Sequence, residues 1–400
     1  MRIKLMLIAM LVLGMVSVYA QIPEAIPGQY IVILKETAAK PVIKQQKRNI
    51  NRLQKEKDNR ATRLLNLAKI KQIKQKNKIL DLAVLSEFAD VLVGFTVKLN
   101  PLEVKSLKTD PDVAGVYQDY KVSLGPPIEA ATPADVSSAQ YNSCAVSKAG
   151  GPVDGSTKNT WIWILDTGID LDHPDLNVQT SATYAKSFIS GESIDDGHGH
   201  GTHCAGIAAA KNNTIGVVGV SAGAKVVPVK VLSNSGSGSW SALINGLNHV
   251  STYDIANDVV SMSLGAYGYA NCENSNPTLR DAIRNLGAAG TWVCMAAGND
   301  YGDAAQNLPG CINGTKVYTI GSIDCNNVCS SFSNFNASVV DWVAVGQSVY
   351  STYKNGGYTT LSGTSMATPV VAGIIHSKAA APVSAGTVTC GGTAYKIAKR

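Results

Sequence analysis

The chain has 400 residues, of which 45% are hydrophobic and 16% charged, a composition that excludes a disordered protein and is typical of a globular one. The formal net charge is +6, and the length leaves room for two domains. Residues 21–125 contain 19 Lys and Arg against 11 Asp and Glu, whereas residues 126–400 contain 14 against 18. The basic residues lie mainly in one helical stretch without interleaved aromatic residues. We therefore expect a basic N-terminal module that docks on an acidic body, and no nucleic-acid partner.

Residues 1–20 match a secretory signal peptide. Arg2 and Lys4 precede an apolar run over residues 5–18, and a cleavage sequence with small residues ends at Ala20. A membrane anchor would need a run of nearer ~20 residues, and no later segment is that long and apolar. We therefore expect a secreted, extracellular protein without a membrane anchor, in which the eight cysteines can form disulfides.

The sequence of residues 21–125 predicts a small α+β domain. Strand-like runs alternate there with helical patterns, one of which is long, basic and amphipathic. The expected order is a strand over residues 29–34, a helix over about 42–85, a strand over 91–99, a helix over 100–108 and a strand over 113–117. Residues 125–160 are rich in Pro, Ala, Ser and Gly, and we expect them to form a linker and surface loop.

Short apolar runs separated by helical candidates begin at Trp161. Continuous apolar strands of this kind are typical of a parallel sheet that is buried on both faces. The expected strands cover residues 161–165, 226–232, 259–264, 292–297, 317–322 and 342–345, and the expected helices residues 201–210, 241–252, 278–289 and 365–376. The sequence therefore predicts a layered α/β domain over residues 126–400. In such sheets, ligand sites form at the carboxyl ends of the strands.

Ser365 lies in a segment rich in small residues, residues 363–369, just ahead of a buried helix. The start of a helix offers unpaired backbone N–H groups and a partial positive charge, which suit a nucleophile whose attack creates an oxyanion. The alternative is an ordinary Ser or Thr cap before a core helix. A catalytic role therefore requires a base, an orienting acid and an oxyanion donor elsewhere in the chain.

Asp166 directly follows an expected strand, at the edge where a site would form. The triplet Asp166-Thr167-Gly168 is also the signature of an aspartic protease. Such an enzyme needs two carboxylates that share a proton. Because no second Asp-Thr-Gly or Asp-Ser-Gly occurs in the sequence, a single chain cannot supply the pair.

Three of the six histidines lie within six positions, at His198, His200 and His203. Imidazoles are good zinc ligands, and Asp195 and Asp196 could assist them. However, spacings of two and three residues on a Gly-rich loop match no standard zinc pattern. A second interpretation is a single catalytic base at the start of a buried helix of small residues. A third is a loop with structural histidines.

Asn299 ends an expected strand in a tight turn. Its side chain could donate a hydrogen bond to an oxyanion there, although an Asn after Gly is usually only a turn residue. The segments around Gly236 and around Ser263-Leu264-Gly265 expose backbone that could pair with an extended peptide as an added strand. Both segments could equally be plain loops or strand ends.

Together these segments resemble the subtilisin-like serine peptidases, and the proteinase K branch in particular, partly because Cys204 lies beside the histidine motif. The order Asp, His, Ser is that family's order. The resemblance covers about residues 161–375. It rests on residues 166–168, 200–206, 263–265, 297–299 and 363–369. Residues 26–33 and 94–119 also resemble the family's inhibitory propeptide.

The resemblance implies a three-layer subtilisin-like domain with a mostly parallel central sheet, preceded by the α+β propeptide of residues 21–125. It implies Ser365 as nucleophile, His200 as general base and Asp166 as the acid that orients the imidazole. Asn299 and the Ser365 backbone N–H would form the oxyanion hole. The residues themselves agree with these roles, because serine is a poor nucleophile without a base and the base needs an orienting acid. Substrate-binding residues would be Gly236, Ser263, Leu264, Gly265, Ala297 and Gly298.

The implied function is a secreted serine endopeptidase of broad specificity that acts through an acyl-enzyme. It would be an autoprocessed zymogen and a monomer, with protein or peptide substrates and its own propeptide as intramolecular inhibitor. No cofactor is implied for catalysis. A structural calcium is implied, with the Asp341 carboxylate and the carbonyls of Thr315 and Val317 as ligands. The alternatives are a catalytically inactive binding protein on the same scaffold and a metal hydrolase that uses the three histidines.

The chain departs from the family's pattern in three respects. The basic helix of the propeptide is longer than usual, and only 35 residues follow Ser365, so we expect shortened C-terminal helices. The cysteine pairs of proteinase K do not map onto this sequence. Our hypothesis pairs Cys272 with Cys311, Cys325 with Cys329 and Cys144 with Cys390, and leaves Cys204 and Cys294 free.

Overall fold

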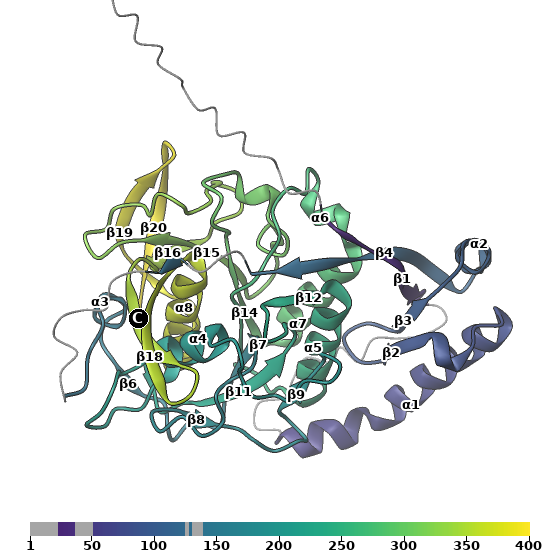
Figure 1. Cartoon of the computed structure of the whole chain (residues 1–400), viewed down its shortest axis with the longest axis horizontal. Coiled ribbons are helices and arrows are strands. Elements are labelled where there is room, and N and C mark those ends of the chain that lie inside the picture. Colours follow the sequence, from purple (N-terminus) through teal and green to yellow (C-terminus); the bar gives the residue numbers. More distant parts are fainter. Residues whose placement is uncertain (1–22, 37–50, 125–127, 130–138) are drawn as a thin grey trace, which may run out of the picture.

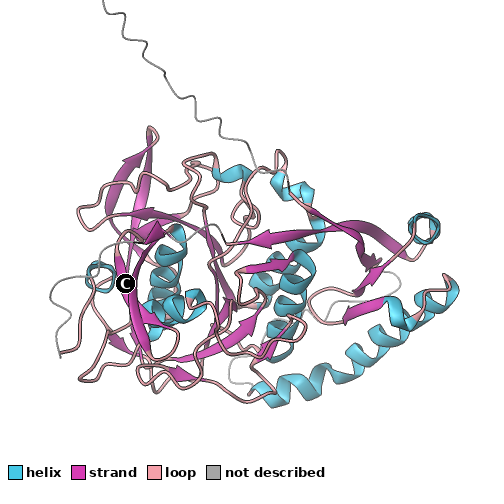
Figure 2. Ribbon diagram, viewed as in Figure 1, coloured by secondary structure: helices cyan, strands magenta, loops and turns pink. Residues whose placement is uncertain are grey.

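The computed structural model describes residues 23–36, 51–124, 128–129 and 139–400 (Figures 1 and 2). The expected signal peptide, residues 1–20, lies outside these ranges. The described chain forms a small N-terminal unit, an antiparallel sheet with two helices, beside a larger unit built around a mostly parallel sheet. Within the described ranges, no helix has the length and apolar character needed to cross a bilayer.

The N-terminal unit confirms the expected α+β arrangement. Its four strands lie in the order β4-β1-β3-β2, and both of its helices contribute to one apolar core, with Ile70, Phe95 and Leu107 fully buried. The second helix begins with a capping box, in which Asn100 and Glu103 each accept the other's backbone N–H. The elements are β1 (Ala25–Leu34), α1 (Arg52–Lys76), β2 (Val84–Phe88), β3 (Gly94–Lys98), α2 (Pro101–Thr109) and β4 (Val113–Ser123).

Helix α1 ends earlier than the sequence predicted, at Lys76 and not near residue 85. The Asn77 side chain donates to the Ile73 carbonyl at 3.0 Å, and Lys78 adopts a left-handed φ of 57°, so the helix cannot continue. A short 3₁₀ turn, η1 (Asp81–Ala83), and strand β2 follow. The first part of the predicted helix, residues 42–50, lies outside the described residues.

The large unit confirms the predicted three-layer α/β architecture. Its main sheet has the strand order β19-β20-β16-β15-β14-β13-β7-β11-β8, with β9 also paired to β11, and all pairings except β19–β20 are parallel. The central strands are buried on both faces, which explains their continuous apolar sequences. The strands are β7 (Ile162–Asp166), β8 (Asn177–Val178), β9 (Lys186–Ser187), β11 (Lys225–Lys230), β13 (Val259–Met262), β14 (Trp292–Ala296), β15 (Val317–Ile323), β16 (Trp342–Val345), β19 (Val383–Cys390) and β20 (Thr393–Lys399).

Helices cover both faces of this sheet. In β14, Val293 and Met295 pack into the core beneath α5 and α7, whereas Trp292 and Cys294 pack into the core beneath α8. This alternation of successive side chains places α4 and α8 on one face and α5 and α7 on the other (Figure 1). The helices are α3 (Cys144–Lys148), α4 (His200–Ala209), α5 (Trp240–Tyr253), α6 (Cys272–Ser275), α7 (Pro277–Ala289) and α8 (Thr364–Lys378), with a 3₁₀ turn, η2 (Ala304–Gln306).

In the described residues, two small sheets and one strand that joins the two units complete the fold. Strand β6 (Val153–Asp154) pairs with β10 (Ser221–Ala222). Strands β17 (Val349–Tyr353) and β18 (Gly357–Ser362) form a hairpin, to which β5 (Ile128–Glu129) adds a third strand. Strand β12 (Ser237–Ser239) belongs to the large unit but pairs with β4 of the N-terminal unit. The two units are therefore joined by a continuous sheet.

The expectation of shortened C-terminal helices is wrong, because residues 383–399 form a β-hairpin. Ala379 ends α8 in a left-handed conformation with φ 55°, and β19 and β20 follow as antiparallel strands. Strand β20 then pairs in parallel with β16 and widens the main sheet. Apolar residues of β20, including Tyr395 and Ile397, join the core under α8.

Two of the three expected disulfides are wrong. Cys272–Cys311 is confirmed, and Cys204 and Cys294 are free and buried as expected. The loop that contains Cys325 and Cys329 does not close on itself. Each of these cysteines bonds to a neighbouring element, as Cys144–Cys325, which ties down α3, and Cys329–Cys390, which ties down the hairpin.

Candidate active site

The predicted catalytic residues meet at the carboxyl-terminal edge of the main sheet. Asp166 is the last residue of β7, and Asn299 follows β14. His200 is the first residue of α4, and Ser365 is the second residue of α8. Strands β7, β13 and β14 are adjacent in the sheet, so the segments after them converge, as a parallel sheet requires.

Asp166 and His200 form a buried hydrogen-bonded pair. The His200 Nδ1 lies 2.8 Å from Oδ1 and 3.0 Å from Oδ2 of Asp166, which is fully buried. The start of α4 can approach the loop after Asp166 this closely because residue 201 is glycine. A Cβ at this position would lie 2.1 Å from the Gly168 carbonyl oxygen. Burial alone would lower the pKa of His200, but the Asp166 carboxylate more than offsets this, so the pKa is raised well above its ordinary value.

Asp196 fixes the start of α4, a role that the sequence did not reveal. Its carboxylate accepts hydrogen bonds from the backbone N–H groups of Gly199 and Thr202 at 2.8 and 2.9 Å, and from the hydroxyls of Thr167 and Thr202 at 2.8 and 2.6 Å. A carboxylate at a helix N-terminus is favourable. Thr167 directly follows Asp166, and the start of α4 carries His200. Asp196 therefore fixes the positions of Asp166 and His200 relative to each other.

The three neighbouring histidines do not converge on one point. His203 is buried, its Nε2 lies 3.1 Å from the Thr359 carbonyl oxygen, and burial lowers its pKa to about 3. In the part of the chain that the structure describes, the group of potential metal ligands that does come together is Asp166, His200 and Cys204. The Cys204 sulfur lies 4.0 Å from His200 Nδ1, and burial raises the pKa of its thiol. The arrangement favours a single base over a three-histidine zinc site.

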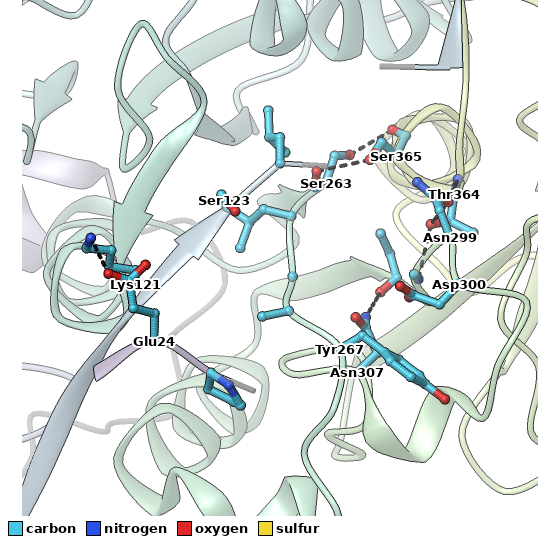
Figure 3. A pocket seen from close by; sticks show the side chains of 17 residues that line it. Glu24, Lys121, Ser123, Ser263, Tyr267, Asn299, Asp300, Asn307, Thr364 and Ser365 are labelled. Carbon is cyan, nitrogen blue, oxygen red and sulfur yellow. Dashed lines mark hydrogen bonds and ion pairs between the residues drawn. The ribbon is translucent and has the colours of Figure 1, made fainter. Parts of the chain in front are cut away.

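Ser365 is the partly exposed residue in the otherwise buried first turn of α8. It exchanges two hydrogen bonds with Ser263, which follows β13. The Ser365 hydroxyl donates to the Ser263 carbonyl at 3.1 Å, and the Ser263 hydroxyl donates to the Ser365 carbonyl at 2.8 Å (Figure 3). These contacts fix the serine beside a strand edge. The Ser365 backbone N–H belongs to the helix start, where no preceding turn offers it a carbonyl.

Asn299 is oriented by Thr364, the residue before the serine. Its Oδ1 accepts the Thr364 backbone N–H and the Thr364 hydroxyl, each at 2.9 Å. The Nδ2 group of the same side chain therefore points away from Thr364 and can donate its N–H bonds elsewhere. A Cβ on Gly363 would lie 3.3 Å from Nδ2 and 3.5 Å from the Ser365 nitrogen, so both donors border the same small space. That space suits an oxyanion.

Asn334 braces the loop that carries Asn299, a second role that the sequence did not reveal. It is buried and makes five hydrogen bonds to residues 297–302. Its backbone N–H donates to Gly298 at 3.0 Å, and Nδ2 donates to Ala297 and Asp300, both at 3.0 Å. Its Oδ1 accepts from the N–H groups of Asp300 and Gly302, both at 2.9 Å. The side chain of one buried residue therefore sets the shape of the loop.

A pocket of about 740 Å³ opens beside Ser365 (Figure 3). Predicted substrate-binding residues Ser263, Leu264, Gly265 and Gly298 line it, as does Asn299. Ala297 lies elsewhere: it is fully buried in the core under α8, and its neighbour Ala296 lines the pocket. Gly236 lies beside the pocket, next to β12. The remaining lining residues are Pro23, Glu24, Lys121, Ser123, Leu124, Ala266, Tyr267, Asp300, Asn307, Thr364 and Ser365.

A model of the subtilase family matches residues 157–382, which include Asp166, His200, Asn299 and Ser365. The chain belongs to the subtilase family. It is a subtilase-type serine protease, and the alternatives of an inactive binding protein and a metal hydrolase find no support. A second match, to the peptidase inhibitor I9 family, covers residues 29–125.

Curated relatives agree with this assignment. An alkaline serine protease of Corniculantispora psalliotae is 35% identical over 301 residues, 72% of this chain and 72% of that protein. Subtilisin DY of Bacillus licheniformis is 42% identical over 217 residues, 54% of this chain and 74% of that protein. A cuticle-degrading protease of Metarhizium anisopliae is 37% identical over 287 residues, 70% of this chain and 69% of that protein. A solved structure of a cold-adapted subtilisin-like serine proteinase is 30% identical, with a TM-score of 0.45, over 56% of this chain and 77% of that one.

The I9 unit of this subtilase reaches into the pocket. Strand β4 pairs antiparallel with β12, and the backbone N–H of Leu124 donates to the Gly236 carbonyl at 2.8 Å. A few residues later, β5 pairs with β18, so that Ile128 lies opposite Ser362. The chain is thus held by backbone on either side of Ser365, as an extended peptide is held when it adds a strand to a sheet.

Asp341 lies away from the pocket, just before β16. Its Oδ2 accepts the Thr319 N–H at 2.9 Å, and its own N–H donates to the Thr319 carbonyl at 3.0 Å. The Val317 carbonyl, two residues earlier on the same strand, faces the same side. Burial raises the pKa of Asp341 to about 6. The Asp341 Oδ1 and the Val317 carbonyl are hard oxygen ligands that fit calcium, whereas the Thr315 carbonyl abuts Gly287 of α7.

Proposed function

We propose that this subtilase is a secreted serine endopeptidase of broad specificity, made as an autoprocessed zymogen. Ser365 is the nucleophile and His200 the general base. Asp166 orients His200 and stabilises the imidazolium, and Asn299 Nδ2 and the Ser365 backbone N–H form the oxyanion hole. The pair formed by Asp166 and His200, with its 2.8 Å contact, supports these roles.

The reaction follows from these roles. Ser365 Oγ attacks the scissile carbonyl carbon while His200 takes the hydroxyl proton on Nε2, the nitrogen that Asp166 leaves free. The carbonyl oxygen becomes an oxyanion between the two donors. His200 then passes the proton to the leaving amine, and an acyl-enzyme on Ser365 remains. A water molecule, deprotonated by His200, releases the new carboxylate by the same steps.

The observation that carries the zymogen proposal is the pairing of Leu124 and Ile128 with segments near Ser365. Leu124 is hydrogen-bonded to Gly236, and Ile128 is paired with Ser362, which precedes Ser365 by three residues. Leu124 also lines the pocket beside Ser365. We therefore place the self-cleavage between Leu124 and Ile128. This agrees with a signal peptide over residues 1–20, a propeptide over 21–125 and a peptidase domain over 126–400.

The same contacts suggest how substrates bind. An extended peptide would take the place of β4, with its backbone paired to Gly236 and β12 on one side and to Ser263, Leu264 and Gly265 on the other. The side chain before the cut would enter the space bordered by Ala296 and Gly298. The pocket lining is mostly small and uncharged, which favours apolar or aromatic side chains without selecting a single one.

The proposed cofactor requirement is structural calcium and no catalytic cofactor. Calcium would bind at Asp341, outside the pocket, and would hold the ends of β15 and β16 together. It would stabilise the fold and take no part in the chemistry. Because metal-binding and catalytic residues are separate, the two effects can be measured independently.

Substitution of the nucleophile tests the proposal. The full chain, as wild type and as Ser365→Ala, is assayed on a chromogenic peptide with and without a serine-directed covalent inhibitor. We expect the variant to be inactive and the inhibitor to abolish wild-type activity, whereas Ser384→Ala, at an exposed serine of β19, remains active. Wild-type activity in Ser365→Ala would refute the mechanism, and inhibition by a chelator at a temperature where the fold is intact would point to a metal hydrolase.

A further inference from the structure

Helix α1 extends well beyond the propeptide core that it helps to form. Ile70 and Ile73, near its C-terminal end, pack in that core. Arg52 begins the helix 18 positions before Ile70, a distance of about 27 Å along a helix axis. Figure 1 shows α1 running from the N-terminal unit to the region below α5 and β9 of the large unit. The N-terminal turns of α1 therefore serve something other than the propeptide core.

The side chain of Arg52 is buried in the peptidase domain. Its guanidinium forms a two-pronged contact with the Asp258 carboxylate, and the bond from Nη2 to Oδ1 measures 2.9 Å. The remaining donors reach the carbonyl of Tyr253 at 3.1 Å and that of Asn159 at 3.0 Å. The guanidinium carbon lies 3.5 Å from the centre of the Trp161 ring. A planar guanidinium can donate two parallel hydrogen bonds to a carboxylate and stack on an aromatic ring at the same time. The site therefore selects arginine over lysine.

A second cation lies one turn further along α1. Lys55 forms an ion pair with Asp254, which is fully buried and also accepts the Thr291 hydroxyl. Arg60 and Lys57, on the same helix, are exposed. Among the described ion pairs, those that join α1 to the large unit are therefore the buried pairs of Arg52 and Lys55, and they do not result from a general attraction between a basic helix and an acidic surface.

The peptidase domain builds the Arg52 site from its own residues. Asp258 also accepts hydrogen bonds from the Trp161 N–H at 2.9 Å, the Trp163 indole at 2.8 Å and the Ile255 N–H at 3.2 Å. These contacts do not involve the propeptide. The carboxylate is therefore oriented whether or not Arg52 is present, and the site persists after the propeptide leaves.

This site lies at the opposite edge of the main sheet from Ser365. Asp258 directly precedes β13, and Ser263 directly follows it. Arg52 therefore binds near the amino ends of the parallel strands, whereas Leu124 binds near their carboxyl ends. The propeptide holds the peptidase domain at both edges at once.

We propose that Asp258, Trp161 and the carbonyls of Asn159 and Tyr253 form an arginine-binding site, separate from the cleft, that retains the cleaved propeptide through Arg52. The proposal rests on the proposed function, because it concerns how the inhibitor is released. Two linked contacts bind more tightly than either alone, since loss of one leaves the other to hold the partner nearby. Release of the propeptide then requires two dissociation steps: β4 must leave β12, and Arg52 must leave Asp258.

The site itself can be tested without catalysis. Hydrogen exchange is measured on the full chain with Ser365→Ala, which keeps the propeptide attached, and with Arg52→Ala or Arg60→Ala added. We expect exchange over residues 51–60 and 253–258 to rise at least about 10-fold with Arg52→Ala and to stay unchanged with Arg60→Ala. Equal exchange in the two added variants would overturn the site.

Release is tested in chains with an intact Ser365. The processed complex of each variant is diluted into a chromogenic peptide, and the rate of activity onset is followed. We expect Arg52→Ala to speed onset by about 30-fold or more, because loss of one partner of a buried charge pair mainly accelerates dissociation. Arg60→Ala should match wild type. Arg52→Lys keeps the charge but cannot make the two-pronged contact with Asp258. Its rate of onset should therefore lie between those of wild type and Arg52→Ala. If Arg52→Ala yields no folded protein, onset in Arg52→Lys equal to wild type would overturn the proposal.

Discussion

The buried Thr364 hydroxyl supports the proposed oxyanion hole from behind. It donates to Asn299 Oδ1 and accepts the Gly298 N–H at 3.1 Å. Because Thr364 immediately precedes Ser365, the nucleophile, the amide donor and the loop after β14 are linked through one residue. The donors are thus positioned before substrate binds, as electrostatic stabilisation of a transition state requires.

We predict that Asn299→Leu, which keeps the size of the side chain but removes the amide, lowers kcat by about 10²–10³-fold with little change in KM. The oxyanion exists only in the transition state, so ground-state binding should not suffer. Steady-state kinetics on a peptide substrate measure both constants, and circular dichroism controls for folding. If KM instead rose by about 10²–10³-fold and kcat were unchanged, Asn299 would be assigned to substrate binding.

The pH dependence of activity should reflect the pair formed by Asp166 and His200. His200 acts as a base only when neutral, and its pKa is raised by Asp166. Protonation below that pKa therefore removes activity, and we predict that kcat/KM rises with pH through a midpoint above 6.5, the ordinary value for histidine, and then levels off. Asp166→Asn should move the midpoint down and lower kcat by about 10⁴-fold. A midpoint below 6.5 in the wild type would contradict this assignment.

At the scale of elements, the sequence predicted most of what surrounds the site. The strands that end at Asp166 and before Ser263 and Asn299 are short, continuous apolar runs, and the helices that begin at His200 and Ser365 start with distinctive motifs. These are local signals. Asp196 and Asn334 gave no such signal, because each acts through backbone groups of a separate loop or helix start, and only the folded chain brings these partners together.

The same reasoning explains which elements were wrong. Helix α1 was predicted too long because apolar residues recur at a helical spacing past Asn77, whereas the chain turns at Lys78. The β19–β20 hairpin was missed because β20 is held by its pairing with β16. That contact joins segments far apart in the sequence and leaves no local signal. The disulfides were mispaired because Cys325 and Cys329 are close in sequence but bond to Cys144 and Cys390 on neighbouring elements.

Calcium binding at the ends of β15 and β16 can be tested through stability. The pKa of Asp341 is raised from 3.8 to about 6 in the folded state, so without calcium the folded protein loses stability as pH rises from about 4 to 6 and regains none above that range. Calcium needs the ionised carboxylate and reverses this loss. We predict that calcium at ~100 times its Kd adds about 3 kcal/mol to the free energy of unfolding at pH 8, and much less at pH 5.

The matched variant for this test is Asp341→Asn. It should lose the calcium effect at pH 8 while remaining at least as stable as the calcium-free wild type, because the buried charge is gone. Thermal unfolding with calcium and with a chelator measures both quantities, and peptidase activity at 25 °C serves as the control. An unchanged calcium effect in Asp341→Asn would place the ion elsewhere.

At the scale of the whole molecule, the propeptide spans the peptidase domain from one edge of the sheet to the other. Strand β4 pairs with β12 and ends in the pocket, and α1 reaches the Arg52 site at the opposite edge. The uneven charge of the chain fits this arrangement, since the basic N-terminal part places Arg52 and Lys55 on buried carboxylates of the acidic part. The inhibitor and the enzyme are thus matched in both backbone pairing and charge.

We propose that Ser365 cuts its own chain at the end of the propeptide. The most direct measurement is mass spectrometry of the full chain after expression, with the new N-terminus identified in the wild type and in Ser365→Ala. We predict a cut between Leu124 and Ile128 in the wild type and an intact chain in the variant. The same cut in Ser365→Ala, in the absence of other peptidases, would contradict the account.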